Sequence, residues 1–390
     1  MTATPACSSS TLQPIASTRA VSPEPYTLCG MEKLSTPFLE IAERKEEGLP
    51  SKLADGPLFV VGIWRSGTSL FYALLNQHPQ VALMYEDDLF FLRSMFWGPR
   101  KTRNWLARWD FFNGAIIRHK IDRSHIPENI SDLKTASEAV QIEYARQKKG
   151  ATIWGCKSPT YFDLLCRLAN TFPNAKFVII WRDLRDICRS IAKAAEGPSF
   201  FRRKGITLRA ILGYRRMKLM CDRLLRDGVP VYQIHYEDLI RDPTAVMKGV
   251  SEFLQIPFDE SMTSLEGADR SAIDEGGHHS LVKGDRILTL RQNSNTLSPA
   301  LKAKVDRYIH LWREQEGGSW PVYPESLDSV PSKPSIWEIV SDQITYRVLW
   351  LWYYIIPAAY SCVPISVWQR YRKLAKRSFS WQTKSESSDS

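Results

Sequence analysis

The sequence predicts an α/β fold: a three-layer α/β/α domain with a central parallel sheet, plus a C-terminal apolar helical segment. Two apolar runs, 58–61 and 177–181, are short and rich in β-branched and aromatic residues, as expected for buried parallel strands. A glycine-bearing turn and an apolar, helix-forming stretch follow the first run at 62–75. Strands that alternate with helices in this way predict parallel pairing through helical crossovers.

The first strand, turn and helix form the stretch around which the domain is organised. The strand is expected at 58–61, the turn at 62–69 and the helix at 70–75, where Asn76-Gln77-His78-Pro79 ends it. In such a turn the backbone N–H groups converge, and the positive end of the helix dipole points at a bound anion. This stretch therefore predicts a phosphate cradle.

The turn differs from a nucleoside-triphosphate loop at one decisive position. Gly62 and Gly67 have the spacing of a Walker A motif, but Thr68 stands where that motif has its lysine. The basic residue is instead Arg65, whose planar fork of donors suits tetrahedral oxyanions such as phosphate and sulfate. An ordinary turn with a surface arginine is the simpler alternative. The additional hydroxyl groups at 66, 68 and 69 favour anion binding.

Residues 61–70 resemble the 5′-phosphosulfate loop of sulfotransferases that use 3′-phosphoadenylyl sulfate (PAPS). That family usually has proline before the arginine, and Trp64 in its place is a departure expected to alter the rim of the loop. The resemblance covers about residues 57–315 and implies a P-loop-like three-layer domain. It also implies that the loop binds the cosubstrate PAPS through Arg65, Ser66, Gly67, Thr68 and Ser69.

Composition limits the other classes of function. The chain has 390 residues and a net charge of +10, which suits an anionic cosubstrate, an acidic acceptor, a membrane surface or nucleic acid. Neither a zinc-finger spacing nor a regular basic and aromatic repeat supports nucleic-acid binding. The seven cysteines are scattered without a C-x-x-C pair, so neither a disulfide scaffold nor a metal site is expected.

Four segments are expected along the chain. Residues 1–50 are rich in Ser, Thr, Pro and Ala and lack an apolar core, so they predict a disordered arm rather than a secretory signal peptide. The sulfotransferase domain is expected at 56–325 and an apolar, membrane-associating segment with a basic flank at 335–378. A polar tail at 379–390 follows.

Acidic residues cluster at 86–88, after the first helix. They could cap a helix beginning at Leu89, where acids favour the dipole. They could also supply a general base near the phosphate loop. In tyrosylprotein-type and several bacterial sulfotransferases a glutamate about this far beyond the loop arginine is the base, and the resemblance assigns that role to Glu86. Other branches of the family use histidine, which makes His119 and His125 alternative candidates.

A second basic residue is expected beside the loop. The short strand 153–157 ends at Lys157 and is stopped by Pro159. A lysine at the carboxyl end of a strand in a doubly wound sheet points toward the ligand crevice. The segment is similar to the family's Gly-x-Lys-[Ser/Thr]-Pro pattern, which implies that Lys157 stabilises charge on the bridging oxygen during transfer.

The strand 177–181 leads into Arg182 and a helix that carries Ser190. An arginine at the strand end and a serine two helical turns later can hold one phosphate from two sides. An acid-capped amphipathic helix is the alternative interpretation. The spacing matches the 3′-phosphate site of the resembled family, and this second motif distinguishes PAPS from ATP.

Two further segments carry residues implied by the same resemblance. The strand and helix at 231–239 contain a Tyr-Glu-Asp-Leu pattern in which Tyr236 would lie near the nucleotide. The loop 278–286 corresponds to one that closes over the nucleotide, and Lys283 or Arg286 would contact the 3′-phosphate there. Asp285 replaces the usual asparagine of that loop.

The stretch 348–368 is uncharged, rich in Trp and Tyr, interrupted by Pro357 and Pro364, and followed by basic residues. It could be an interfacial or re-entrant anchor, a spanning helix, or helices packed on the domain. Membrane association is the favoured interpretation, with the C-terminus and the catalytic domain in the cytoplasm.

The predicted reaction is transfer of a sulfonate group from PAPS to a hydroxyl of an acceptor, with Glu86 as base and with Lys157 and Arg65 stabilising charge. No metal is expected, because cationic side chains neutralise the developing charge. Carbohydrate, lipid, protein and small alcohols remain open as acceptors. The alternatives are an ATP-dependent P-loop phosphotransferase and a non-catalytic, membrane-bound nucleotide-binding protein.

Overall fold

The structure is a computed structural model. The residues it describes all lie in one compact unit, residues 50–390, and they are 53–90, 105–127, 130, 132–197, 200–273, 282, 284–285, 287, 297–316, 333–362, 366–367 and 370. The predicted arm at 1–50 and polar tail at 379–390 lie outside the described residues.

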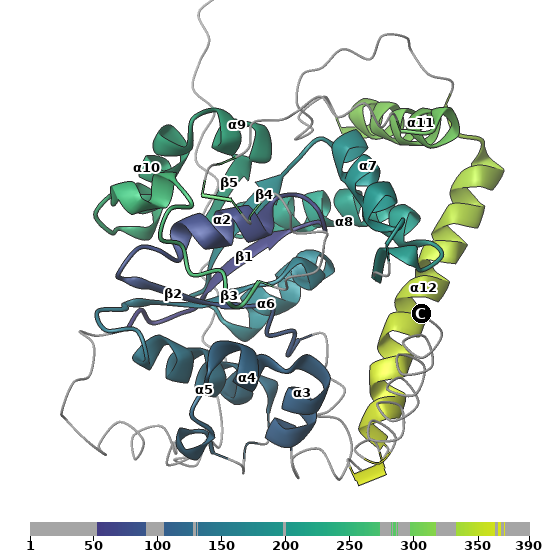
Figure 1. The fold of residues 1–390 in the computed structure, drawn as a ribbon. Coiled ribbons are helices and arrows are strands. Elements are labelled where there is room, and N and C mark those ends of the chain that lie inside the picture. Colours follow the sequence, from purple (N-terminus) through teal and green to yellow (C-terminus); the bar gives the residue numbers. More distant parts are fainter. Residues whose placement is uncertain are drawn as a thin grey trace, which may run out of the picture. The chain divides into compact units, whose positions relative to one another are not determined.

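Five parallel strands form the central sheet, in the order β2-β3-β1-β4-β5 (Figure 1). Their bounds are β1 Leu58–Gly62, β2 Val81–Tyr85, β3 Ile153–Lys157, β4 Lys176–Trp181 and β5 Val231–His235. The register aligns their carboxyl ends: Tyr85 lies opposite Lys157, and Trp181 lies opposite His235. The predicted central parallel sheet is therefore confirmed, with both apolar runs of the sequence as adjacent central strands.

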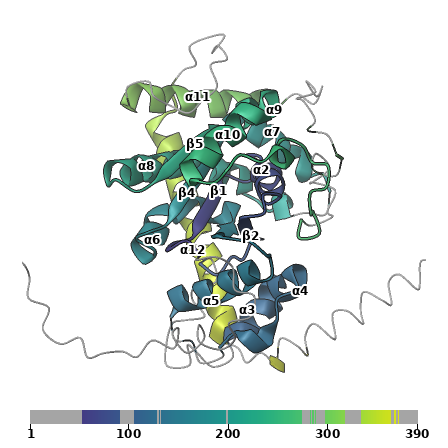
Figure 2. The same ribbon diagram turned by 90° about the vertical axis from the view of Figure 1, so that its left-hand side faces the viewer.

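Helices cover both faces of the sheet, and Figure 2 shows α6 and α8 on one side with α2 on the other. The helices of the domain are α2 Thr68–Leu75, α3 Trp105–Asn113, α4 Ala115–His119, α5 Leu133–Arg146, α6 Leu165–Thr171, α7 Leu184–Ala194, α8 Ile206–Arg226, α9 Tyr236–Arg241, α10 Pro243–Leu254, α11 Pro299–Glu316 and α12 Ile336–Cys362. Single 3₁₀ turns occupy Arg123–His125, Pro159–Asp163, Phe200–Arg202 and Glu260–Thr263.

Alternate residues of β1 and β4 belong to two separate hydrophobic cores, one on each face of the sheet. In β1, Phe59 and Val61 pack toward α6, α7 and α8, whereas Leu58 and Val60 pack toward α2, α9 and α10. Both faces of β1 are thus fully buried, which explains why the sequence at 58–61 is a continuous apolar run rather than an alternating one. The three-layer α/β/α arrangement follows from this two-sided burial.

Local signals in the sequence begin several of these helices. Asp183 accepts a hydrogen bond from the backbone N–H of Arg185 at the start of α7. Asp242 does the same for Ala245 at the start of α10, where Pro243 occupies the first turn. These are N-cap and proline positions that a helix start favours, so the boundaries of α7 and α10 follow from local chemistry.

The C-terminal apolar stretch, as far as Cys362, forms the second half of one long helix. α12 begins at Ile336 and continues through Pro357 to Cys362, and it runs along one edge of the domain beside α8 (Figure 1). Within the described part of the chain, the length and hydropathy of the helices fall short of what crossing a membrane requires. Asp342 on α12 pairs with Lys304 and Tyr308 of α11, so its first half is attached to the domain.

Candidate active site

The turn between β1 and α2 has the backbone of an anion-binding loop. Gly67 has φ +98°, and a Cβ atom there would lie 2.2 Å from the ring of Tyr236. Only glycine accepts both constraints, because L side chains avoid this conformation and the aromatic ring leaves no space. Thr68 follows as the first residue of α2, so the free N–H groups of the helix start face the loop.

The loop contains a buried hydroxyl without a hydrogen-bond partner among the described residues. Ser66 is completely buried, and among the described residues its side-chain oxygen has no hydrogen-bond partner. An unsatisfied buried hydroxyl is costly, by about 1–3 kcal/mol. A phosphate or sulfonate oxygen in the loop would satisfy it, so the residues present fit the predicted anionic group.

Arg65 lies at the centre of one cluster of side chains. Its Nε donates a 2.9 Å hydrogen bond to the Ser190 hydroxyl on α7, and its backbone is left-handed, with φ 71°. Burial, and then the neighbouring Arg182, lowers the pKa of Arg65 to about 10. The guanidinium is therefore still charged at neutral pH, but it is held at an energetic cost that a bound anion would relieve.

Arg182 completes this cluster from the end of β4. Its Nη1 donates a 2.9 Å hydrogen bond to the Arg65 carbonyl oxygen, and its guanidinium lies 4.3 Å from the ring centre of Tyr236. Its Nε is buried without a hydrogen-bond partner among the described residues. We call Arg65, Arg182, Ser190 and Tyr236 the arginine cluster.

A second cluster lies where β2 and β3 end. Lys157 is 1% exposed, and its Nζ donates to Glu86 Oε1 at 2.6 Å and to Ser69 Oγ at 3.1 Å. The ammonium also lies 4.0 Å from the ring centre of Tyr85, whose hydroxyl is 2.9 Å from Ser69 Oγ. We call Glu86, Lys157, Ser69 and Tyr85 the carboxylate cluster. Ser69 connects it to the phosphate loop.

Glu86 is held in place through its backbone. Its N–H donates to the Lys157 carbonyl oxygen at 2.7 Å, and its own carbonyl oxygen accepts a 3.0 Å bond from Asn113. Arg118 of α4 donates to the adjacent Tyr85 carbonyl at 3.1 Å. Glu86 has φ 53°, a left-handed conformation that costs a non-glycine residue on the order of 1 kcal/mol or more. Its side chain is 28% exposed, so the carboxylate is accessible.

The electrostatics of this cluster keep the lysine charged. Burial alone would lower the pKa of Lys157, but the adjacent Glu86 carboxylate and the Tyr85 hydroxyl outweigh it, and the pKa is raised above its usual value. Burial raises the pKa of Tyr85, so its phenol stays protonated. The cluster therefore presents an ammonium and a carboxylate side by side at neutral pH.

Two further acids adjoin Glu86, and the sequence alone does not separate their roles. Asp87 is buried and accepts hydrogen bonds from Tyr161 and Gln141, which makes it part of the core. Asp88 accepts 2.8 Å bonds from the hydroxyls of Ser158 and Thr160. Burial, and then the Glu86 charge, raises the pKa of Asp88 to about 7. The hydroxyls that follow Lys157 in the sequence are the signal that could have indicated this partnership.

The two histidines that were alternative candidates for the base, His119 and His125, are not members of either cluster. His119 Nε2 lies 3.1 Å from the backbone nitrogen of Tyr85, and burial lowers its pKa to about 4, so the ring is neutral and part of the core. His125 is exposed and pairs with Glu143 at 2.9 Å.

Lys283 and Arg286, predicted at the 3′-phosphate, lie outside the described residues. Trp64 is buried and packs against Phe162 and Phe200.

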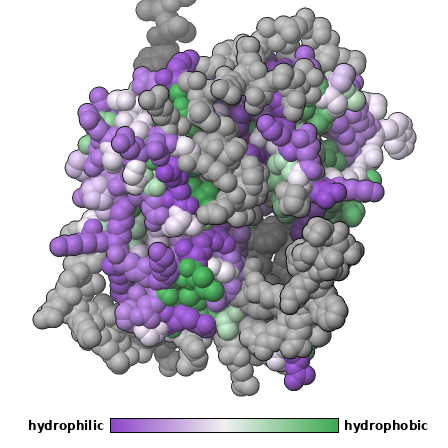
Figure 3. Space-filling view, in the orientation of Figure 1, coloured by the Kyte–Doolittle hydropathy of each residue, from purple (hydrophilic) through white to green (hydrophobic). Residues whose placement is uncertain are grey.

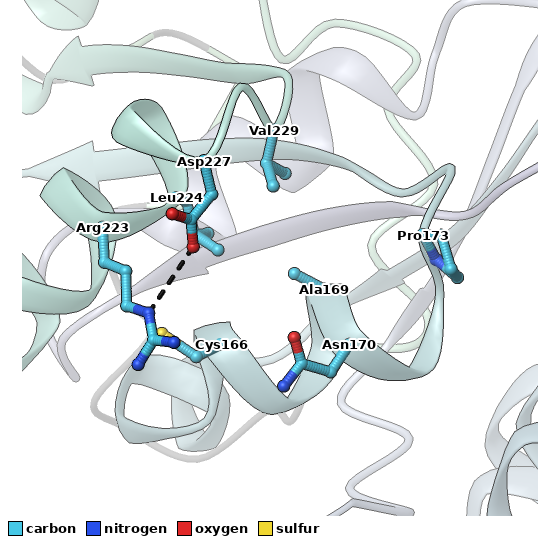
Figure 4. A pocket seen from close by; sticks show the side chains of 8 residues that line it. All are labelled: Cys166, Ala169, Asn170, Pro173, Arg223, Leu224, Asp227 and Val229. Atoms are coloured by element: carbon cyan, nitrogen blue, oxygen red, sulfur yellow. Dashed lines mark ion pairs between the residues drawn. The ribbon is translucent and has the colours of Figure 1, made fainter. Parts of the chain in front are cut away.

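A separate hollow of about 420 Å³ lies away from both clusters, between α6 and the end of α8 (Figure 4). Pro173 and Val229 line it, and they precede β4 and β5. It thus lies at the amino edge of the sheet, opposite the edge where ligands of doubly wound sheets bind.

Among the described residues, no group of three or more His, Cys, Asp or Glu side chains is arranged to hold a metal ion.

The fold and the site together define a P-loop-like α/β protein whose phosphate loop uses arginine and whose crevice contains a carboxylate–ammonium pair. A model of the sulfotransferase family matches residues 57–260. The chain therefore belongs to the sulfotransferase family, as the motifs at 61–70 and 182–190 predict.

Individual relatives are distant. Protein-tyrosine sulfotransferase 1 of Danio rerio is 25% identical over 261 residues, which cover 67% of this chain and 66% of that protein. Protein-tyrosine sulfotransferase A of Caenorhabditis elegans is 25% identical over 214 residues, which cover 54% of this chain and 52% of that protein. The chain thus spans about half to two thirds of the length of these two relatives. The solved sulfotransferase domain from the curacin biosynthetic pathway has a TM-score of 0.48 at 18% identity, covering 67% of this chain and 98% of that domain.

Proposed function

We propose that this protein transfers a sulfonate group from PAPS to a hydroxyl of an acceptor, with Glu86 as the general base. The observation that carries the proposal is the position of Lys157, which donates both to Glu86 and to Ser69 at the start of α2. One ammonium thereby joins a candidate base to the phosphate loop. A reaction that removes a proton from one substrate and stabilises a leaving phosphate on the other needs this juxtaposition.

The phosphate loop and the arginine cluster divide the binding of PAPS between them. The 5′-phosphosulfate would lie in the loop, where Ser66, Thr68, Ser69 and the N–H groups of the α2 start offer donors. The 3′-phosphate would bind Arg182 and Ser190. Tyr236, stacked on Arg182, would border the nucleotide. The unpartnered Nε of Arg182 and hydroxyl of Ser66 support this assignment, because each gains a bond when the anion binds.

The reaction would proceed as an in-line displacement at sulfur. Glu86 takes the proton from the acceptor hydroxyl, and the acceptor oxygen forms a bond to sulfur. The bond between sulfur and the bridging 5′-phosphate oxygen breaks, and its electron pair remains on the phosphate of the departing 3′-phosphoadenosine 5′-phosphate (PAP). Lys157 and Arg65 stabilise the charge that develops on the sulfonate and on the leaving oxygen.

A phenolic hydroxyl is the acceptor to test first. Both relatives described above are named protein-tyrosine sulfotransferases, and the accessible carboxylate of Glu86 suits deprotonation of a phenol. Peptides with a tyrosine next to acidic residues would also complement the basic net charge of +10. Sugars, lipids and small alcohols are the further classes for an acceptor screen.

The decisive experiment compares PAP with ADP by calorimetry on the wild type, Arg182→Ala and Arg189→Ala. The proposal predicts a strong preference for PAP, which Arg182→Ala removes by weakening PAP roughly 10- to 100-fold while leaving ADP little changed. Arg189 lies on α7 one residue before Ser190 and pairs with Asp186, so Arg189→Ala is the matched control. Equal affinities, or tighter ADP binding with Mg²⁺, would contradict the proposal and support an ATP-dependent phosphotransferase.

A further inference from the structure

The first half of α12 has two opposite faces. Asp342, Tyr346 and Leu349 point toward the domain: Asp342 and Tyr346 are buried, and a Cβ added to Gly205 at the start of α8 would lie 2.4 Å from Leu349. Asp342 bonds to Lys304 and Tyr308, and Glu338 pairs with Arg307 of α11 at 2.7 Å. This half of the helix is therefore attached to α11 through Glu338 and Asp342 and packs on the start of α8 through Leu349.

The opposite face is an apolar stripe that the domain leaves exposed. Its members recur at helical spacing of three and four residues and are each more than 40% exposed: Trp337 (82%), Val340 (42%), Ile344 (58%), Val348 (60%) and Leu351 (52%). We call these residues the α12 stripe. Scattered single apolar residues on a surface are normal, but a continuous row along one helix face marks an interaction site.

Other exposed apolar side chains do not form such a row. In Figure 3 hydrophilic residues cover much of the described face toward the viewer, and one compact green area lies over α4. Ile117 on that helix is 81% exposed. The α12 stripe differs because it extends over about four turns and is continued by an uncharged sequence, with no Asp, Glu, Lys or Arg between Arg347 and Arg370.

Charge indicates what kind of partner covers the stripe. The acidic residues of α12, Glu338 and Asp342, are both engaged by basic residues of α11. The outward charges are basic: Arg347 and Arg370 are exposed, and Arg372, Lys373, Lys376 and Arg377 follow in the sequence. An apolar stripe bordered by cations complements an anionic lipid surface, where the apolar side chains enter the acyl boundary and the cations meet the headgroups.

We propose that the α12 stripe binds in the plane of an anionic membrane surface, so that the sulfotransferase domain is held peripherally on the bilayer. A second copy of the chain is a poorer match. A contact of the stripe with itself would bring the basic borders of two copies together, and the acids of α12 that could neutralise them are already paired within each copy. The inference does not depend on the proposed reaction.

Flotation of the full chain with lipid vesicles tests this proposal. We expect binding to vesicles of phosphatidylcholine mixed with phosphatidylglycerol, weaker binding to pure phosphatidylcholine, and further weakening at high salt. The double variant Ile344→Ser/Val348→Ser should reduce the partition coefficient at least tenfold, because both side chains lose apolar area that would enter the lipid. Arg347→Glu/Arg370→Glu should reduce it about fivefold for each cation lost.

Ile117→Ser is the matched control, since it removes the same side chain from a position outside the stripe that is even more exposed than Ile344. Its vesicle binding should equal that of the wild type. The substituted stripe residues are exposed, so thermal unfolding should show unchanged folding in all variants. Absence of vesicle binding, or binding that survives Ile344→Ser/Val348→Ser, would overturn the proposal. A dimer in light scattering that the same double variant converts to a monomer would assign the stripe to a second copy instead.

Discussion

The arginine cluster and the carboxylate cluster lie at the same edge of the sheet but differ in how their charges are balanced. The first places two guanidinium groups together, and burial, followed by the charge of Arg182, lowers the pKa of Arg65. The second pairs its ammonium with a carboxylate at 2.6 Å, and Lys157 has a raised pKa. An uncompensated pair of cations is a site that needs an anion to complete it, whereas a compensated pair keeps its carboxylate and its ammonium charged before any ligand arrives.

This difference predicts that substitutions in the two clusters affect different measurements. Changes in the arginine cluster should alter nucleotide affinity, and changes in the carboxylate cluster should alter turnover at nearly unchanged affinity. The following variants test that division, from the largest expected effect to the smallest.

Glu86→Gln should have the largest effect. It keeps the shape of the side chain but removes the proton acceptor, so with the proposed reaction kcat should fall by roughly 10²–10⁴-fold. The PAP dissociation constant should change less than threefold, since the amide still fits beside Lys157. Steady-state kinetics with a tyrosine-containing peptide and calorimetry with PAP measure the two quantities. His125→Ala, which removes the exposed partner of Glu143, is the control and should retain full activity. A loss of activity in His125→Ala with retention in Glu86→Gln would reverse the assignment of the base.

Gly67→Ala should weaken the arginine cluster through the backbone. The new methyl group would lie 2.2 Å from the Tyr236 ring at a φ of +98°, so the loop or Tyr236 must move. We expect a loss of about 2–3 kcal/mol in the free energy of unfolding, together with weaker PAP binding. Chemical denaturation and calorimetry provide the measurements. Gly228→Ala, at a φ of +73° with no atom within 4 Å of the new Cβ, separates the cost of the dihedral angle from that of the clash.

Asp88→Asn tests whether this acid, which lies beside the carboxylate cluster, determines the pH dependence of stability. The pKa of Asp88 is raised from 3.8 to about 7 in the folded protein, first by burial and then by Glu86. Between these two values the unfolded chain has lost this proton and the folded chain has kept it, so stability falls as pH rises through that window and is constant above it. Relative to the wild type, Asp88→Asn should therefore be more stable at pH 8 than at pH 4, by on the order of a few kcal/mol, since each pKa unit corresponds to about 1.4 kcal/mol. A difference in melting temperature that does not vary with pH would contradict this account.

Ser190→Ala should have the smallest effect. Arg65 would lose the 2.9 Å bond that its Nε donates to the serine hydroxyl, and a bound 3′-phosphate would lose one donor. We expect a roughly three- to tenfold increase in the PAP dissociation constant, with kcat changed less than twofold. Titration calorimetry and saturation kinetics distinguish the two. A large drop in kcat at unchanged affinity would mean that the division between the clusters is wrong.

Much of the fold and the arginine cluster could be predicted from the sequence because their signals are local. The burial of β1 and β4 on both faces makes them continuous apolar runs, and Arg182 and Ser190 lie on one strand-to-helix unit. The contact between Arg65 and Ser190, which are 125 residues apart, follows once both are placed at the carboxyl edge of a parallel sheet.

The surroundings of Glu86 could not be predicted in the same way. Asn113 and Arg118 hold the carbonyl groups at the end of β2, yet they come from a Trp- and Arg-rich stretch without a clear period. Asp88 was open to interpretation as a helix cap, and its bonds to Ser158 and Thr160 depend on side chains about 70 residues away. Such contacts depend on tertiary packing, for which a single sequence contains no periodic signal.

The bond between Lys157 and Glu86 also has a consequence for the order of events in a catalytic cycle. While the ammonium occupies Glu86 Oε1, an acceptor hydroxyl must compete with it for the carboxylate. A sulfonate bound beside Lys157 offers that ammonium another oxygen, which frees the carboxylate. We therefore expect a compulsory sequence in which nucleotide binds first and leaves last, so that PAP inhibits competitively against PAPS and noncompetitively against the acceptor.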